Sequence, residues 1–178
     1  MASGKTLVYF AAGKRAPPGL IQRFGEAHEL ELIRVDTKDE VLALLNRSFP
    51  GCLVLDASYD PEAALELCAS IKADAFTSIV PTVVLICDRP EGVGELPAAG
   101  LQAGADEVVS DLVSEEERSL RLELVLRRAA RDVNVHPTTR LPGTGSIERD
   151  FAERMAKGSH FAVCYADLDH FKEFNDRY

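Results

Sequence analysis

The sequence predicts an α/β fold built on a doubly wound, five-stranded parallel sheet, followed by a long helix and part of a second α/β domain. Short apolar runs alternate five times with longer amphipathic stretches between residue 5 and about residue 113. The apolar runs also lack the polar–apolar alternation of a strand with one solvated face. We therefore expect helices to cover both faces of the sheet.

The five strands and the helices between them can be placed from this pattern. Strands are expected at residues 7–12, 30–35, 52–55, 82–87 and 107–109. Helices are expected at residues 17–27, 38–49, 61–73 and 94–103, the last weakened by its glycines and proline. Prolines suit the first turn of the helix at 17–27, because its first N–H groups have no partner within the helix. The strand at 52–55 ends on Asp56.

A long helix is expected from Ser114 to about Val133. Ser114 and Glu117 have the spacing of a capping box, and acids in the first turn suit the helix dipole. Apolar residues follow at spacings of four, three and four: Leu122, Leu126, Ala129 and Val133. One interpretation is that this short stripe packs on the sheet of its own domain together with Leu120, Leu124 and Val125. The other is a parallel dimer seam, and both can hold in succession. The predicted divisions are residues 1–113, the linker helix 114–135, and 136–178.

Composition excludes several classes of protein. Apolar residues make up 46% of the 178, which is enough for a sizeable core, and the net charge is −9. An acidic protein is poorly suited to nucleic acid or anionic membranes, so we expect neither as a partner. No signal-peptide or membrane-spanning length of apolar sequence occurs, and the four cysteines form no C-x-x-C pair. We expect a cytoplasmic protein with reduced core thiols.

The last residues carry a candidate site for a metal and a phosphate. After a helix expected at 146–157, an apolar strand expected at 161–166 delivers Asp167 and Asp169 at a spacing of two. Carboxylates at a strand end are ligands for Mg²⁺, and the N–H groups of a following helix suit anionic oxygens. The other interpretation is that both are solvated strand-end acids.

The order D-x-D-x-F-K-x-x-N-D in residues 167–176 resembles the GGDEF family, the diguanylate cyclases that join two GTP molecules into cyclic di-GMP. Residues 136–143 also resemble the element that opens such domains. The resemblance implies that Asp167 and the carbonyl of Leu168 bind the metal. It implies that the amides of His170 and Phe171 hold GTP phosphates and that Asn175 reads guanine. The family's signature loop is not in this sequence, so we expect the chain as given to be inactive.

The first 113 residues resemble a response-regulator receiver domain. The likeness rests on Leu53-Val-Leu-Asp56, on the strand that follows Pro81, and on Gly104-Ala-Asp-Glu-Val-Val. It implies a flavodoxin-like sheet of order 2-1-3-4-5, with Asp56 at the phosphoacceptor position, at the carboxyl edge of the sheet.

Three parts of that family's phosphorylation site are missing here. Residues 10–15 contain no acid where receivers have a pair, the fourth strand ends without a hydroxyl, and Asp111 stands where a lysine belongs. Phosphoryl transfer needs Mg²⁺ and a fixed cation to neutralise developing charge. We therefore expect a pseudo-receiver, in which Lys14 or Arg15 substitutes for the missing positive charge. Alternatively, Asp56 only caps the following turn, near Ser58 and Asp60.

Together these features predict the regulatory part of a two-component, cyclic di-GMP signalling protein. The receiver-like domain would control dimerisation of a GGDEF cyclase, through the linker helix or a receiver face. Mg²⁺ and GTP are expected in the intact parent, with weak or absent Mg²⁺ binding here, and a histidine kinase or other signalling protein is an expected partner. The alternative is a non-enzymatic protein-binding or nucleotide-sensing module with degenerate receiver and GGDEF parts.

Overall fold

The computed structural model describes residues 6–13, 15–47, 50–74, 77–89, 92–132, 144–158, 160–164 and 166–167. The chain divides into two compact units between residues 132 and 133. The five-stranded sheet lies wholly in the first unit.

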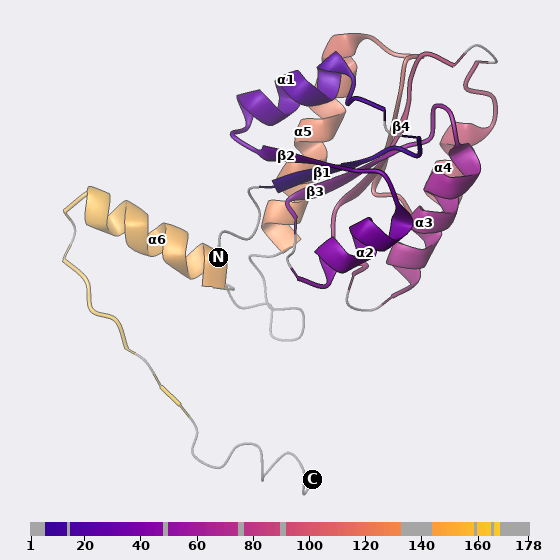
Figure 1. Ribbon diagram of the computed structural model, residues 1–178. Coiled ribbons are helices and arrows are strands. Elements are labelled where there is room, and N and C mark those ends of the chain that lie inside the picture. Colours follow the sequence, from indigo (N-terminus) through magenta and orange to yellow (C-terminus); the bar gives the residue numbers. More distant parts are fainter. Residues whose placement is uncertain are drawn as a thin grey trace, which may run out of the picture. The chain divides into compact units, whose positions relative to one another are not determined.

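The first unit is a five-stranded parallel sheet with helices on both faces (Figure 1). Its strands are β1 (Thr6–Phe10), β2 (Glu31–Val35), β3 (Cys52–Asp56), β4 (Thr82–Ile86) and β5 (Glu107–Ser110). Its helices are α1 (Gly19–Ala27), α2 (Lys38–Leu45), α3 (Pro61–Ala73), α4 (Leu96–Gln102) and α5 (Glu115–Asp132). The strand order is β2-β1-β3-β4-β5, which confirms the predicted flavodoxin-like topology.

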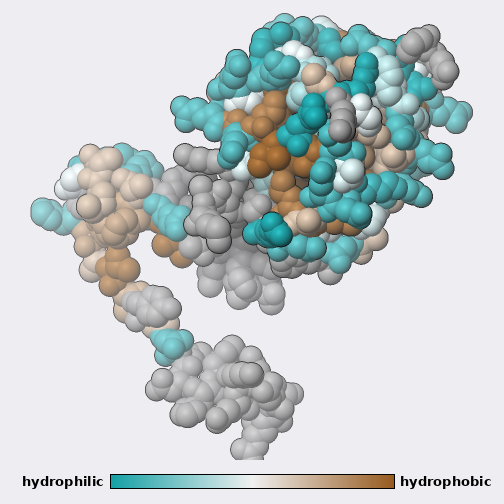
Figure 2. Space-filling view, viewed as in Figure 1, coloured by the Kyte–Doolittle hydropathy of each residue, from teal (hydrophilic) through white to brown (hydrophobic). Residues whose placement is uncertain are grey.

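Two apolar layers hold the helices to the sheet. One layer joins α1 and α5 to alternate residues of the strands, including Tyr9, Val54 and Leu85. The other joins α2 and α3 to the intervening strand residues, including Val8, Phe10 and Leu55. Strands β3 and β4 are buried along their whole length, which explains why their sequences are continuously apolar. Figure 2 shows a mostly hydrophilic visible face on this unit, with a hydrophobic strip beside the edge strand β2.

Helix α1 begins at Gly19, two residues later than predicted. Pro18 is its N-cap and has extended backbone, with ψ at 153°. The residue before a proline is also disfavoured in the helical region, so Pro17 and Pro18 delay the helix instead of opening it. Pro18 therefore stays extended, and Arg15, Ala16 and Pro18 lie beside Asp56 at the carboxyl end of β3.

Helix α5 belongs to the first unit. Ser114 Oγ accepts the Glu117 N–H at 3.2 Å, which confirms the side chain to backbone half of the predicted cap. Leu122 and Val125 are 1% and 2% exposed and pack on the sheet, as the first interpretation of the stripe predicts. Leu120 and Leu124 are exposed instead, which corrects that interpretation for these two residues. The boundary predicted after residue 113 would separate α5 from the sheet that it covers. The contacts place the division after residue 132 instead.

The second unit contains α6 (Thr144–Ala156), close to the predicted helix. Its apolar residues Ile147, Phe151 and Met155 are exposed at a spacing of four, and Phe151 meets Phe161 edge to face at 5.2 Å between ring centroids. The strand predicted at 161–166 is wrong for the described residues, since 160–164 have no strand structure. A strand needs a neighbour for its backbone groups, and none of the described residues of this unit supplies one.

The four cysteines are all free thiols. Cys52, Cys68 and Cys87 are buried free thiols, as predicted, whereas Cys164 is free but exposed, which corrects the core assignment for that residue. Among the described residues, no helix combines the length and apolarity that crossing a bilayer requires.

Candidate functional site

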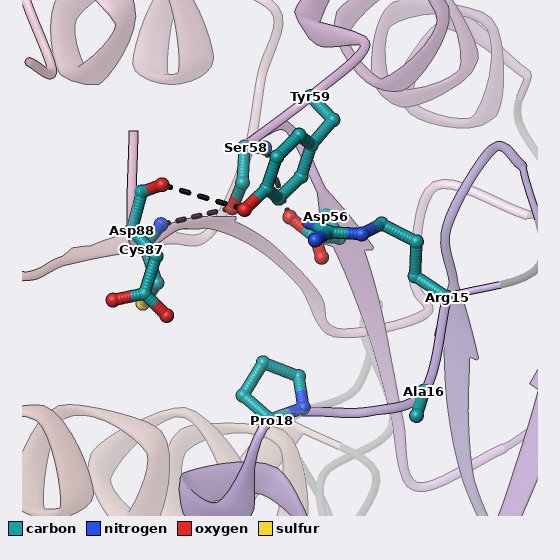
Figure 3. Close-up of a pocket in the computed structure, with 8 residues that line it drawn as sticks. All are labelled: Arg15, Ala16, Pro18, Asp56, Ser58, Tyr59, Cys87 and Asp88. Atoms are coloured by element: carbon teal, nitrogen blue, oxygen red, sulfur yellow. Dashed lines mark hydrogen bonds between the residues drawn. The ribbon is translucent and has the colours of Figure 1, made fainter. Parts of the chain in front are cut away.

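The candidate site is a pocket of about 270 Å³ at the carboxyl edge of the sheet (Figure 3). Asp56, the last residue of β3, lines the pocket and is only 6% exposed. The loops after β1, β3 and β4 supply the rest of the lining: Arg15, Ala16, Pro18, Ser58, Tyr59, Cys87 and Asp88. The topology places the pocket, because the strand ends of a parallel sheet meet at one edge.

Both oxygens of the Asp56 carboxylate accept hydrogen bonds from neutral donors. The Tyr9 hydroxyl donates to Oδ2 at 2.5 Å, and the Ser58 amide donates to Oδ1 at 2.9 Å. The second bond is the turn cap that the sequence suggested. Burial, followed by the bond to Asp56, raises the pKa of Tyr9 well above its usual range. Tyr9 therefore remains a hydrogen-bond donor to Asp56 at neutral pH.

Tyr9 is the hydrogen-bond partner of Asp56 that sequence reasoning missed. In the sheet Tyr9 is paired with Val54, two residues before Asp56. Side chains two residues apart on a strand share a face, so Tyr9 and Asp56 both point toward the α1 and α5 layer. Tyr9 is fully buried, and a buried phenol needs a hydrogen-bond partner. That requirement was the available signal, but the strand register that selects Asp56 is not visible in the sequence.

Arg15, one of the two residues expected to supply the missing positive charge, lies in the pocket but forms no ion pair with Asp56 among the described residues. Arg15 lines the pocket, and its guanidinium carbon lies 3.1 Å from the centroid of the Tyr59 ring. Within the described part of the chain, no ion pair joins Arg15 to Asp56. Lys14, the other residue proposed for this role, lies outside the described residues. Arg15 is thus held as a cation over an aromatic ring, near the carboxylate but not paired with it.

Hydrogen bonds connect the loops after β3, β4 and β5. Ser58 Oγ accepts the Cys87 N–H at 2.9 Å, and Asp111 Oδ2 accepts the Asp88 N–H at 3.0 Å. Asp88 has a left-handed backbone, with φ at 54°. The Tyr59 hydroxyl also donates to the Asp88 carbonyl, at 3.4 Å. Asp111, at the position expected for a lysine, therefore holds a loop and adds negative charge to this edge.

Cys87 is a buried thiol in the same pocket. Its pKa is raised by burial, and the neighbouring Arg118 opposes that rise. The Arg118 guanidinium donates to the sulfur from Nη1 at 3.7 Å. A thiol with a raised pKa is a poor nucleophile, so we assign Cys87 a packing role.

The residues present do not fit a divalent metal at this site. The strand register pairs Phe10 with Leu55, the residue before Asp56, and the described residues that follow Phe10, 11–13 and 15, bring no acid. Mg²⁺ prefers several oxygen ligands in octahedral geometry. No cluster of three potential ligands occurs among the residues that the structure describes. Asp56 instead has its oxygens engaged by Tyr9 and Ser58.

Of the residues predicted to bind metal and GTP in the second unit, Asp167 lies within the described part of the chain. Asp167 is exposed. Leu168, His170, Phe171 and Asn175 lie outside the described residues. Their proposed roles in binding metal and GTP stay predictions.

Comparison with known proteins gives distant relatives. No family model matches the chain. It is 22% identical over 158 residues to the phosphate regulon transcriptional regulatory protein PhoB of Klebsiella pneumoniae, covering 83% of this chain and 68% of that protein. It is 26% identical over 123 residues to the probable transcriptional regulator ycf27 of Porphyra purpurea, covering 68% of this chain and 46% of that protein. It is 29% identical over 104 residues to histidine kinase P4 of Formosa agariphila, covering 58% of this chain but 7% of that protein.

Solved structures agree on the fold. A response regulator from Chloroflexus aurantiacus matches with a TM-score of 0.57 at 18% identity, over 69% of this chain and 98% of that one. The receiver domain of NtrX from Brucella abortus matches with a TM-score of 0.55 at 18% identity, over 68% and 98% respectively. The first unit therefore has the fold of these receiver domains and is similar in sequence to proteins named as transcriptional regulators and as a histidine kinase. In this chain the carboxyl edge of that fold pairs the strand-end aspartate with a tyrosine hydroxyl. None of these five proteins is named as a diguanylate cyclase.

Proposed function

We propose that this receiver domain is a pseudo-receiver, which signals through association and not through phosphorylation of Asp56. The observation that carries the proposal is the engagement of both Asp56 oxygens by Tyr9 and Ser58, in a pocket without a second acid from the β1 end. A carboxylate that attacks a phosphoryl group needs a free oxygen, a metal and a fixed cation nearby. Here Asp111 adds negative charge and so repels an incoming phosphate.

The proposed output is control of a GGDEF domain that begins in residues 136–178. Support comes from the sequence likeness of residues 167–176 and from the place of α5 in the sequence, just before that segment. In the intact parent, Asp167 and Leu168 would bind Mg²⁺, and His170, Phe171 and Asn175 would bind GTP. Joining two GTP molecules requires two loaded domains to face each other, so dimer geometry would set the rate.

A second candidate function is a non-enzymatic module that binds a protein or senses a nucleotide. The observation that favours it is the exposed stripe of Ile147, Phe151 and Met155 on α6. Exposed apolar residues at helical spacing form a surface suited to a partner. Cyclic di-GMP formation by the parent protein, supplied with GTP and Mg²⁺, would favour the enzyme; binding of GTP without turnover would favour the sensor.

Labelling with acetyl phosphate and Mg²⁺ tests the pseudo-receiver directly. The chain is incubated beside a receiver that has both acids and the lysine, and both are analysed on a Phos-tag gel and by mass spectrometry. We expect the reference receiver to shift and this chain to remain unmodified. Stoichiometric phosphate on Asp56 would overturn the proposal, and an Asp56→Asn variant would confirm the position of any label.

Light scattering tests the association mechanism. A chain ending at residue 132 keeps α5 on the sheet, whereas one ending at residue 113 would expose the surface that Leu122 and Val125 cover. A dimer in both the 132-residue chain and the full chain assigns the contact to the receiver domain or α5. A dimer only in the full chain assigns it to the residues after 132. Monomers in both chains would contradict dimerisation through the receiver domain, α5 or the residues after 132.

A further inference from the structure

The pocket beside Asp56 has a buried floor and an exposed rim. Asp56 and Cys87 belong to the floor, since both line the pocket and are 6% and 5% exposed. Arg15 and Tyr59 line the same pocket but are exposed, Tyr59 over 49% of its surface. A solute that reaches the floor must therefore pass the residues of the rim.

One contact joins two sides of this rim. Arg15 lies in the segment between β1 and α1, and Tyr59 lies in the segment between β3 and α3. The guanidinium carbon of Arg15 is 3.1 Å from the centroid of the Tyr59 ring, and Figure 3 shows the Arg15 side chain reaching toward that ring. The face of the ring attracts a cation, and the planar guanidinium also stacks on it. The contact thus bridges two loops at the mouth of the pocket.

The two ends of this bridge are anchored, but the contact itself is weak. The amide of Gln22 donates to the Pro17 carbonyl at 2.7 Å, which ties the segment before α1 to that helix. The Tyr59 hydroxyl donates to the Asp88 carbonyl. Within the described part of the chain, the Arg15 guanidinium has no hydrogen bond or ion pair. A cation–π contact at an exposed position is a modest attraction, so it can break and re-form while the anchors hold.

We propose that the Arg15–Tyr59 contact is a reversible strap across the mouth of the Asp56 pocket. While the contact is made, the strap limits the entry of small solutes to Asp56 and Cys87. When it breaks, the Arg15 side chain moves into solvent and the floor becomes accessible. Access to a buried acid is thereby controlled from the surface of the domain. The inference goes beyond the proposed function, because it concerns entry to the pocket and not the chemistry of Asp56.

The rate at which Cys87 reacts with methyl methanethiosulfonate tests the strap, because this thiol lines the pocket. Its thiolate attacks the reagent sulfur, a methyl disulfide forms and methanesulfinate leaves. The full chain carries Cys164→Ser, which removes the exposed thiol. Peptide mass spectrometry follows Cys87 and also Cys52, which is 1% exposed in the core and serves as the reference. Dividing the Cys87 rate by the Cys52 rate removes the contribution of global unfolding.

Arg15→Ala and Tyr59→Ala should each raise this ratio of rates by about two- to fivefold, the factor that corresponds to one exposed cation–π contact. The double variant should rise no further than the larger single effect, because both substitutions break the same contact. Arg23→Ala is the matched control. It removes an exposed cation from α1 that pairs with Glu115 and does not line the pocket, so the ratio should stay unchanged.

An unchanged ratio in both single variants would overturn the inference. A double variant whose increase is the product of the two single increases would overturn it as well, because the residues would then act independently. Labelling with acetyl phosphate keeps the proposed function separate. Arg15→Ala should still leave Asp56 unmodified, since the acid pair and the lysine stay absent. Phosphate on Asp56 would refute the pseudo-receiver, whereas the strap is judged by the Cys87 ratio.

Discussion

The Tyr9 hydroxyl donates a 2.5 Å hydrogen bond to the Asp56 carboxylate, across the pairing of β1 with β3. The bond joins an aromatic residue of the core to the acid that ends the central strand. It gives the buried carboxylate a neutral donor on one oxygen while the Ser58 amide occupies the other. Each oxygen of Asp56 therefore has a hydrogen-bond donor supplied by the fold itself.

Replacing Tyr9 by phenylalanine tests how much this bond stabilises the fold. The variant keeps the ring in the core but leaves a buried carboxylate with one donor fewer, so the free energy of unfolding should fall by about 1–3 kcal/mol. Urea denaturation measures the change. Tyr59→Phe is the matched control: its hydroxyl bond is long and its side chain is 49% exposed. An equal effect in both variants would show that the Tyr9 bond has no special role.

Alkaline pH should destabilise the native protein more than the Tyr9→Phe variant. The pKa of Tyr9 is raised in the folded state, while in the unfolded chain it is about 10. The contribution is therefore complete below about pH 10 and falls above it at about 1.4 kcal/mol per pH unit, as the unfolded tyrosine loses its proton. Urea midpoints between pH 8 and 11 measure the slope.

Ionisation of the buried thiols also lowers the free energy of unfolding at alkaline pH, and it does so equally in the native protein and in the Tyr9→Phe variant. Burial raises the pKa of Cys52 to about 12 and that of Cys68 to about 11. Each thiol therefore stabilises the folded state less as the pH rises above the pKa that the thiol has in the unfolded chain. The difference between the native protein and the variant removes this common loss. Identical slopes above pH 10 would contradict the assigned state of Tyr9.

Asp111 should stabilise the loop after β4 through its acceptor oxygen. Asp111→Ala leaves the Asp88 N–H without its partner in a left-handed conformation, so this amide should exchange its hydrogen faster. Asp111→Asn retains an acceptor oxygen and should exchange nearly as slowly as the native protein. Hydrogen exchange followed by NMR measures both. Unchanged protection in the alanine variant would show that other contacts hold the loop.

Lys72 should be a strong stabilising residue at the opposite edge of the sheet. Its ammonium donates to the Ser78 and Val80 carbonyls at 2.9 and 2.8 Å and to Asp106 at 2.7 Å. Lys72→Met removes all three bonds from a side chain that is 12% exposed, and should cost about 2–4 kcal/mol. Lys38→Met, which breaks an exposed pair with Glu66, should cost less than about 1 kcal/mol. Similar costs would mean that burial of Lys72 adds nothing.

The fold was predictable from the sequence because its signals are local. Continuous apolar runs predict strands covered on both faces, and Thr37, Asp60 and Ser114 accept the cap bonds that begin three of the helices. The position of Asp56 followed from the strand that it ends. The predicted strand at 161–166 was wrong in the described residues because an apolar run is a strand only when another strand pairs with it.

The composition of the site was less predictable because it depends on contacts between distant residues. Tyr9 and Asp56 are 47 positions apart, and Asp88 and Asp111 are 23 apart. The sequence showed that an acid pair and a lysine were missing, but not which groups replace them. Arg15 was proposed to neutralise Asp56, and it instead stacks on Tyr59. The direction of a flexible side chain depends on neighbours that only the folded chain brings close.

Hydrogen bonds from the Cys87 N–H to Ser58, from the Asp88 N–H to Asp111 and from the Tyr59 hydroxyl to the Asp88 carbonyl connect the segments that follow β3, β4 and β5. Displacing one of these loops would therefore disturb the hydrogen bonds that hold the next. A partner protein that contacts Tyr59 would in this way shift the segment between β5 and α5, and the seat of α5 on the sheet would change without any covalent modification.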